Sequence, residues 1–323
     1  MKVAIIGVAH MHAHSYVAEF QTRGIEVVGV YDRNPELGQA FSQKYDIPFF
    51  TELEALLTLE SDSVNICSEN AFHKEYALKA FEYGKHVIVE KPMALSTADA
   101  EAMVAAGKAA GKLLVVAHPV RFAEPIQNVK KVIDSGQLGA LKLINSSNHG
   151  KNPGGWFIDP ALSGGGALID HTVHICDLVN YLFGIEPKEV YAYAGKSQAD
   201  MPVEDIGLIQ LTMSEGVIMS LDTSWNRPAT YPVWGDAILE LVFEKGQMTV
   251  DGFGRKLKIF DDLTGTVEEY FFEESMDSRM INAFIEAIEQ DLPSPVSGED
   301  GLYTVRITEA AFKSATDKKL ITI

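Results

Sequence analysis

Short apolar runs rich in β-branched residues alternate with helical stretches along the first third of the sequence. Val3 to Ile6 is such a run, a polar helical stretch follows from about Ala13 to Arg23, and Ile25 to Val30 is the next run. Apolar runs that alternate with helices imply parallel strands covered by helices on both faces. We therefore predict an α/β, Rossmann-type doubly wound parallel sheet. Further strands are expected near 49, 63–67, 86–89 and 113–117, and further helices near 35–44, 52–57, 72–83 and 97–110.

The pattern changes after Pro119. Longer strand-like runs follow, and hairpin-sized turns such as Ser214 to Gly216 join some of them, which predicts a mostly antiparallel open sheet. With 323 residues, two domains are expected: residues 1–119, and an α+β domain of residues 120–323. The late helices are expected to pack on the second sheet or to return to the first domain. The runs lie at 140–148, 189–194, 206–213, 217–225 and 237–243, and the helices near 125–135, 277–290 and 299–316.

The charge and the two cysteines limit the partners and the location of the chain. A net charge of -18 argues against a nucleic-acid partner, because phosphate binding needs a basic surface. It also disfavours an anionic membrane surface, and the first apolar run ends at Gly7, too early for a signal peptide or a membrane span. Because the first apolar run is so short, we expect a cytoplasmic protein. Cys67 and Cys176 lie beside aliphatic residues, so we expect two reduced buried thiols.

The turn after the first strand is where a doubly wound sheet binds phosphates. Only Gly7 of this turn matches G-x-G-x-x-G, because Ala9 and His12 stand at the other glycine positions. Asp32 ends the second strand at the spacing where a carboxylate accepts hydrogen bonds from an adenosine ribose, although it could instead cap the next helix. We expect NAD as the cofactor, and Arg33 leaves NADP possible because it can pair with a 2′-phosphate.

Three histidines, His10, His12 and His14, crowd this turn. They could line the cofactor cleft, cap the first helix, contact a phosphate or, with other histidines, bind a metal ion. The sequence has no cysteine or carboxylate pattern of known spacing to complete a metal site. We therefore expect no metal. His10 and Met11 are expected to contact the cofactor together with Gly7, Ala9 and His12.

Two long motifs identify the chain as similar to the glucose-fructose oxidoreductase / inositol dehydrogenase (Gfo/Idh/MocA) family. They are NICSENAFHKEYALKAFEYGKHVIVEKP at residues 65–92 and SGGGALIDHTVHICD at residues 163–177, in the order of the family. The resemblance implies an NAD(P)-dependent oxidoreductase that acts on a hydroxyl or carbonyl carbon of a sugar, a cyclitol or a related polyol. It also implies a homodimer or homotetramer that associates through the second sheet.

The resemblance implies the catalytic residues too. In Glu90-Lys91-Pro92 the lysine would reach the substrate near the nicotinamide, and in the Asp170 to His174 motif the histidine would carry the proton and the aspartate would assist. The chemistry agrees, because alcohol oxidation needs a proton acceptor that titrates near neutral pH, and an ammonium can stabilise oxyanion charge. Asp170 and His174 are four residues apart on an expected helix, so both can face one cleft.

Further contacts are expected around these residues. Ser68, Asn70 and His73 follow the fourth strand, near the expected path of the nicotinamide ribose, although Asn70 and His73 could instead cap the following helix. The remaining candidates for the cofactor are Glu90 and Lys91, and those for the substrate are Lys91, His118, His149, Trp156, Asp170, His171 and His174.

A different kind of protein is the main alternative. A regulator or sensor could keep the fold, bind NAD(P) and be catalytically silent. The joint presence of Lys91, Asp170 and His174 favours the enzyme.

Overall fold

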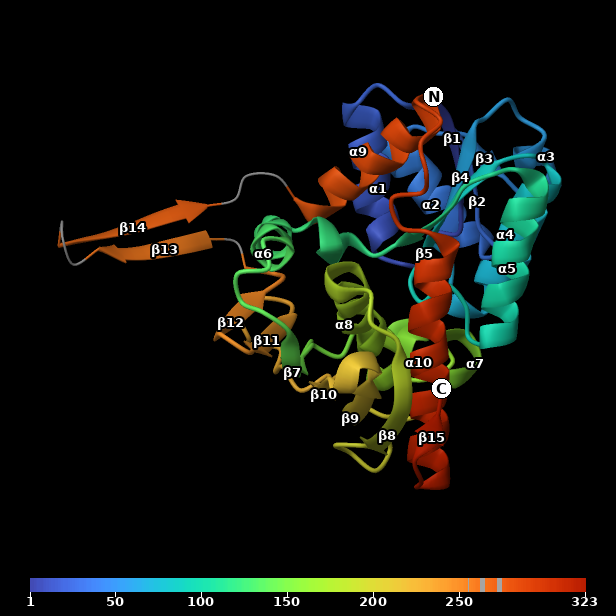
Figure 1. The fold of residues 1–323 in the computed structure, drawn as a ribbon. Coiled ribbons are helices and arrows are strands. Elements are labelled where there is room, and N and C mark those ends of the chain that lie inside the picture. Colours follow the sequence, from blue (N-terminus) through green and yellow to red (C-terminus); the bar gives the residue numbers. More distant parts are fainter. Residues whose placement is uncertain (255, 262–264, 272–274) are drawn as a thin grey trace.

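Residues 1–118, called the first half below, form a parallel sheet of six strands (Figure 1). The computed structural model describes residues 1–254, 256–261, 265–271 and 275–323. The strand order β3-β2-β1-β4-β5-β6 confirms the predicted doubly wound sheet. The strands are β1 (Lys2–Ile6), β2 (Glu26–Tyr31), β3 (Phe49–Phe50), β4 (Ser63–Ile66), β5 (His86–Glu90) and β6 (Leu114–Ala117).

The helices of this half begin and end where local sequence signals place them. Asn34 caps α2 by accepting hydrogen bonds from the next turn, and Ser96 caps α5 by accepting from the Asp99 amide. Gly111 ends α5 in the left-handed conformation. The predicted ranges hold to within about two residues. The helices are α1 (His12–Thr22), α2 (Pro35–Tyr45), α3 (Leu53–Leu57), α4 (His73–Glu82) and α5 (Thr97–Ala110), with the short 3-10 helix η1 (Asn70–Phe72).

Residues 119–323, called the second half below, contain a sheet of seven strands in the order β12-β11-β7-β10-β9-β8-β15. Strands β7 and β10 run parallel and the other neighbours run antiparallel, so the expected mostly antiparallel sheet is confirmed. Its residues alternate between buried and exposed along β9, as expected when one face is covered. The strands are β7 (Leu141–Ser147), β8 (Pro187–Gly195), β9 (Ile206–Met213), β10 (Ile218–Asp222), β11 (Ile238–Phe243), β12 (Gly246–Asp251) and β15 (Ile321–Thr322).

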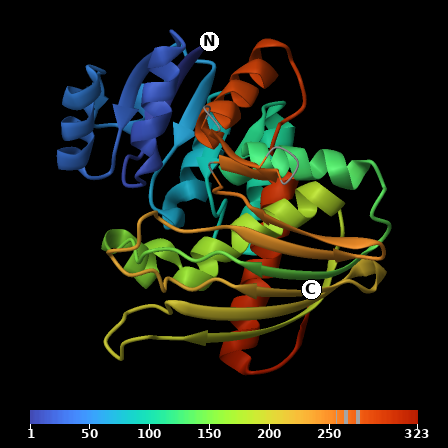
Figure 2. The ribbon, with the colours of Figure 1, turned by 90° about the vertical axis from the view of Figure 1, so that its left-hand side faces the viewer.

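Helices α8 and α10 cover one face of this sheet, and Figure 2 looks onto the sheet from the side away from α10. Helix α9 instead returns to the first half, where Ser15 donates a hydrogen bond to Asp277 over 3.2 Å. Both expected destinations of the late helices therefore occur. The helices are α6 (Glu124–Asp134), α7 (Pro160–Ser163), α8 (Ala167–Phe183), α9 (Met276–Glu289) and α10 (Gly298–Asp317), with the 3-10 helices η2 (Pro119–Phe122), η3 (Gly155–Ile158) and η4 (Ser214–Gly216).

One buried apolar core surrounds the parallel sheet and another lies between the seven-stranded sheet and its helices. The backbone joins the halves where the Val116 amide donates to the Val296 carbonyl over 3.0 Å. The Thr97 amide adds a hydrogen bond to the Glu309 carboxylate of α10 over 3.0 Å. Such contacts hold the two halves together but do not mark where one domain ends. The domain boundary at Pro119 therefore stays a prediction.

Three further observations complete the fold. A hairpin of β13 (Lys256–Asp261) and β14 (Thr266–Phe271) projects away from the body in Figure 1, and the sequence did not indicate it. Cys67 and Cys176 are buried free thiols, as expected. Within the described ranges, none of the helices is long and apolar enough to cross a membrane.

Candidate active site

The carboxyl end of β5 meets the first turns of α8, and here residues from both halves come into contact. Lys91 directly follows β5, and Asp170 lies in α8. The Lys91 ammonium donates to Asp170 Oδ1 over 2.6 Å, although the two residues are 79 positions apart. The ion pair is largely shielded from solvent, since the Lys91 side chain is 6 % exposed and that of Asp170 14 %. The lysine and the acid thus meet, as the sequence indicated.

Two more side chains lie against the Asp170 carboxylate. Trp225 donates its indole N–H to Oδ2 over 3.2 Å, and His171 Nε2 lies 3.3 Å from the same oxygen. Burial alone would raise the pKa of Asp170, but Lys91 and His171 overcome it and hold that pKa well below its ordinary value. Asp170 is therefore a fixed carboxylate, and the contact with Trp225 was not indicated by the sequence.

His174 lies one helical turn beyond Asp170 and is also buried. Burial, and then the Lys91 charge, lower the pKa of His174 well below its usual range. Its Nδ1 has no hydrogen-bond partner among the described residues. His118, after β6, presents its ring edge-on to His174 at 6.4 Å between centroids, and burial lowers its pKa as well. A neutral imidazole with a free nitrogen beside an ammonium suits proton acceptance.

The glycine run before α8 lets the helix begin against Glu204. A Cβ on Gly166 would lie 1.8 Å from the Glu204 carbonyl oxygen, so only glycine fits. The Glu204 carboxylate accepts from the amides of Gly166 and Leu168 over 2.8 and 3.3 Å. These contacts fix the start of α8 and hence the positions of Asp170 and His174.

The turn after β1 has the features that a dinucleotide needs. Gly7 adopts φ +77°, and a Cβ there would lie 2.6 Å from the Ser68 backbone, so the turn packs closely against the end of β4. The first turn of α1 carries no acidic residue, which leaves its positive end suited to phosphate. Asp32 follows β2 and accepts hydrogen bonds from the amides of Val8 and Asn34, both over 2.7 Å. The turn and the Asp32 carboxylate stand at the spacing of a dinucleotide site, and their contacts with phosphate and ribose stay predictions.

The surroundings of Asp32 favour NAD over NADP. The Arg33 guanidinium lies 3.9 Å above the Phe72 ring and 3.3 Å from Glu75, so it is already engaged. Glu69 is a second acid near Asp32, and burial followed by the Asp32 charge raises the pKa of Glu69. A 2′-phosphate would therefore approach two acids.

Asn70 and His73 bind backbone carbonyls of neighbouring segments. Asn70 donates to Ser163 over 3.0 Å, which links the first half to α7. The two ring nitrogens of His73 lie 2.9 Å from the Pro92 carbonyl and 3.2 Å from that of Ser68. Their predicted role beside the cofactor stays a prediction.

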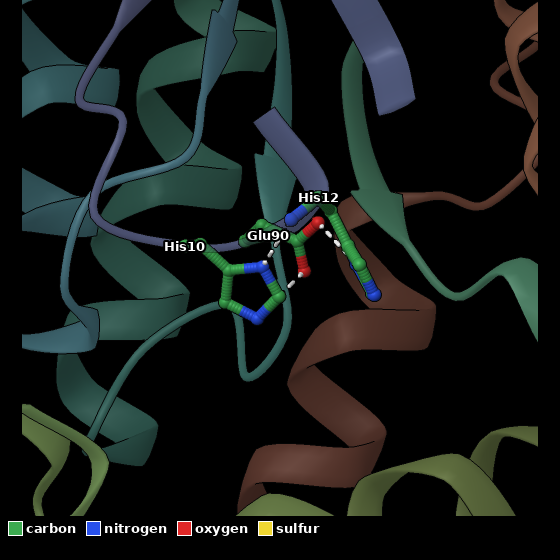
Figure 3. Close-up of side chains that lie close together, drawn as sticks. All are labelled: His10, His12 and Glu90. Carbon is green, nitrogen blue, oxygen red and sulfur yellow. Dashed lines mark hydrogen bonds and ion pairs between the residues drawn. The ribbon is translucent and has the colours of Figure 1, made fainter. Parts of the chain in front are cut away.

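His10, His12 and Glu90 lie together beneath the turn (Figure 3). His12 Nδ1 is 3.0 Å from Glu90 Oε1, and the His12 amide donates to His10 Nδ1 over 3.2 Å. Burial favours neutral forms, yet Glu90 raises the pKa of His12, and the histidines hold the pKa of Glu90 well below its usual value. His12 and Glu90 therefore each favour the charged form of the other.

The same three side chains offer ligand atoms within 4.8 Å of one another, as a metal site would. The lone pair of His10 Nδ1 is already engaged by the His12 amide, and His10 Nε2 lies 3.8 Å from Glu90. Metal ligands must direct unprotonated atoms at one point. The cluster is therefore described better as a hydrogen-bonded network than as a metal site. The expected lack of a metal stays a prediction. His14 is separate and binds the Tyr45 hydroxyl over 2.9 Å.

The candidate substrate residues fall into different places. His171 lies in the site, with its Nδ1 donating to the Asn148 carbonyl over 2.6 Å. Trp156 donates to the Ala9 carbonyl over 3.0 Å, which brings the second half onto the turn after β1. His149 lies between Asp222 and Asp236, whose hydrogen bonds raise its pKa to about 9. His149 is therefore part of an ion-pair network, and its contact with substrate stays a prediction.

Comparison with known proteins agrees with this geometry. Residues 1–118 match the model of an oxidoreductase family with an NAD-binding Rossmann fold, and residues 126–249 match the GFO/IDH/MocA C-terminal domain. The chain is 30 % identical over 263 residues to the Bacillus subtilis protein named Uncharacterized oxidoreductase YrbE, covering 78 % of this chain and 75 % of that protein. It is 27 % identical over 271 residues to the myo-inositol 2-dehydrogenase of Thermotoga maritima, covering 80 % and 79 %.

The fold is shared with solved structures. The crystal structure of GenD2 from gentamicin A biosynthesis in complex with NAD superposes with a TM-score of 0.88 at 22 % identity, covering 100 % of this chain and 96 % of that one. At that identity the likeness concerns the fold. The family models and the relative from Bacillus subtilis together carry the assignment: the chain belongs to the Gfo/Idh/MocA family of NAD-binding oxidoreductases.

Proposed function

We propose that this chain is an NAD-dependent dehydrogenase that transfers hydride between the nicotinamide and a hydroxyl or carbonyl carbon of a sugar, a cyclitol or a related polyol. The contact between Lys91 and Asp170, one turn from His174, is the observation that carries the proposal. The names of relatives support the substrate class. Besides the myo-inositol dehydrogenase, a D-glucoside 3-dehydrogenase of Escherichia coli is 33 % identical over 191 residues, covering 57 % of this chain and 54 % of that protein.

The chain's own residues supply the acid-base chemistry. When bound, NAD supplies the hydride acceptor. His174 takes the hydroxyl proton as a neutral base, and the Lys91 ammonium stabilises negative charge on the reacting oxygen. Asp170 holds the ammonium in place and compensates its charge. In the reductive direction His174 returns the proton to the same oxygen.

The first test measures nicotinamide absorbance while the protein is incubated with NAD and a panel of inositols, monosaccharides and anhydrosugars. We expect turnover of at least one compound and a preference for NAD over NADP. The alternative is a catalytically silent sensor of the same fold. Tight NAD binding without turnover across the whole panel would favour the sensor and sink the proposed function.

Asp32 should control cofactor affinity. We expect Asp32→Asn to weaken NAD binding about 10- to 100-fold, because hydrogen bonds to a charged group are worth roughly 1.5–3 kcal/mol. Asparagine keeps only one of the two oxygens that accept from the amides of Val8 and Asn34, so one of these hydrogen bonds is lost as well. Arg33→Ala is the matched control and should change NAD affinity less than threefold, since Arg33 is engaged by Phe72 and Glu75. Calorimetric titration with NAD checks both, and an unchanged affinity in Asp32→Asn would contradict the assignment.

The remaining expectations complete the proposal. We propose domains of residues 1–119 and 120–323 and a cytoplasmic homodimer or homotetramer without a nucleic-acid partner. The uncovered face of the seven-stranded sheet supports association, since it exposes large apolar side chains. Among them Tyr193 is 63 % exposed, Ile218 56 % and Leu208 50 %.

A further inference from the structure

The imidazole of His10 is a buried polar group that the reaction above does not use. It belongs to the turn after β1, yet rings of the second half enclose it. Phe157 lies 5.4 Å from it and Trp156 6.1 Å, measured between ring centroids. The residue as a whole is 3 % exposed. A buried imidazole needs hydrogen-bond partners for both nitrogens, so the role of each nitrogen is informative.

The structure fixes which nitrogen carries the proton. The His12 amide donates to His10 Nδ1 over 3.2 Å, so Nδ1 is an acceptor and the proton of the neutral ring lies on Nε2. Burial lowers the pKa of His10 to about 3, although Glu90 opposes that shift. The ring therefore stays neutral across the working pH range. Its Nε2 is a hydrogen-bond donor with a fixed orientation.

That donor lacks an acceptor among the residues that the structure describes. Glu90 Oε2 lies 3.8 Å from Nε2, beyond hydrogen-bond distance. Figure 3 marks this approach of Nε2 to the Glu90 carboxylate with a dashed line. The same Glu90 oxygen accepts a hydrogen bond from the Lys91 amide over 3.1 Å, so the His10 ring lies next to the backbone of a reacting residue.

We propose that His10, which the sequence predicts to contact the cofactor, is instead a substrate-binding residue whose Nε2–H donates to an oxygen of the polyhydroxylated substrate next to the reacting one. The inference rests on the proposed function and names one more contact of the same site. Lys91 and His174 already serve the reacting oxygen, so a neighbouring hydroxyl is the acceptor left for His10. A neutral donor held in place by its other nitrogen selects hydroxylated substrates, because an analogue without that oxygen leaves the buried N–H unpaired.

The test compares His10→Phe, which keeps a ring beside Phe157 but removes the donor, with His10→Gln, which restores an N–H. With the best substrate of the panel, His10→Phe should lower kcat/KM about 10- to 100-fold, as expected for one lost buried hydrogen bond. His10→Gln should recover part of the loss. NAD affinity should stay within about threefold in both, and the pH profile of kcat/KM should not shift, because His10 is neutral throughout.

His14→Phe is the matched control, since His14 lies only four residues further along the chain, in α1, but binds the Tyr45 hydroxyl. His14→Phe should change neither kcat/KM nor the affinity for NAD. Normal kcat/KM in His10→Phe, or an NAD affinity that falls as much as kcat/KM, would overturn the inference and leave the proposed function intact. If the wild-type protein turns over nothing in the panel, the proposed function fails first and this inference falls with it. Thermal unfolding of each variant shows whether the loss comes from the fold.

Discussion

Replacing Lys91 with methionine should lower kcat/KM by about a thousandfold or more. The ammonium is buried and fixed 2.6 Å from the Asp170 carboxylate, so it is preorganised to stabilise charge on the reacting oxygen. Loss of one such group typically costs about 10²–10³ in rate. The Asp170 charge would also lose its main partner, which adds to the effect. Steady-state kinetics with the best substrate of the panel measure the change.

Two further variants separate catalysis from folding. Lys91→Met combined with Asp170→Asn removes both charges and should restore thermal stability lost in the single variant, without restoring turnover. Lys74→Met removes a lysine of a comparable pair, because Lys74 donates to Asp99 over 2.5 Å at the surface. It should leave kcat/KM within about twofold, as exposed ion pairs contribute little. A Lys91→Met protein with near-normal turnover would remove the basis of the enzymatic proposal.

The architecture could be predicted because its signals are local. Each strand of the first sheet is a short apolar run, and turns such as Ser214 to Gly216 mark hairpins directly. The meeting of Lys91 and Asp170 is not local. That contact was predicted from the position of Lys91 at the carboxyl end of a strand and from the motifs shared with the family. The spacing of the two residues in the sequence would not have predicted it.

The surroundings of the site could not be predicted, since they depend on side-chain directions. Trp225 reaches Asp170 from the segment after β10, and no pattern in the sequence indicates that contact. His10, His12 and His14 look equivalent in sequence. In the structure His12 pairs with Glu90, His10 Nε2 stays 3.8 Å from Glu90, and His14 binds Tyr45. Tertiary contacts thus decide roles that sequence leaves open.

His174→Asn should lower turnover by about 10²–10⁴, the usual contribution of a positioned general base. Asparagine keeps a polar side chain of similar length but cannot accept the proton. The pH dependence of kcat/KM is an independent test of this role. Protonation at low pH removes the base, so oxidation must decline below the pKa of His174. Burial, followed by Lys91, holds that pKa well below 6.5, so kcat/KM for oxidation should stay level through pH 6.5 and decline only at lower pH.

Lys91 and His174 are coupled in this profile, which provides the control. Removing the Lys91 charge should raise the pKa of His174, so the residual activity of Lys91→Met should begin to decline at a higher pH than that of the wild type. Lys91→Arg keeps the charge and should keep the wild-type position of the decline. In His174→Asn the decline should vanish, since its titrating group is gone. An acid decline that persists unshifted in both His174→Asn and Lys91→Met would assign the titration, and with it the base, to another residue.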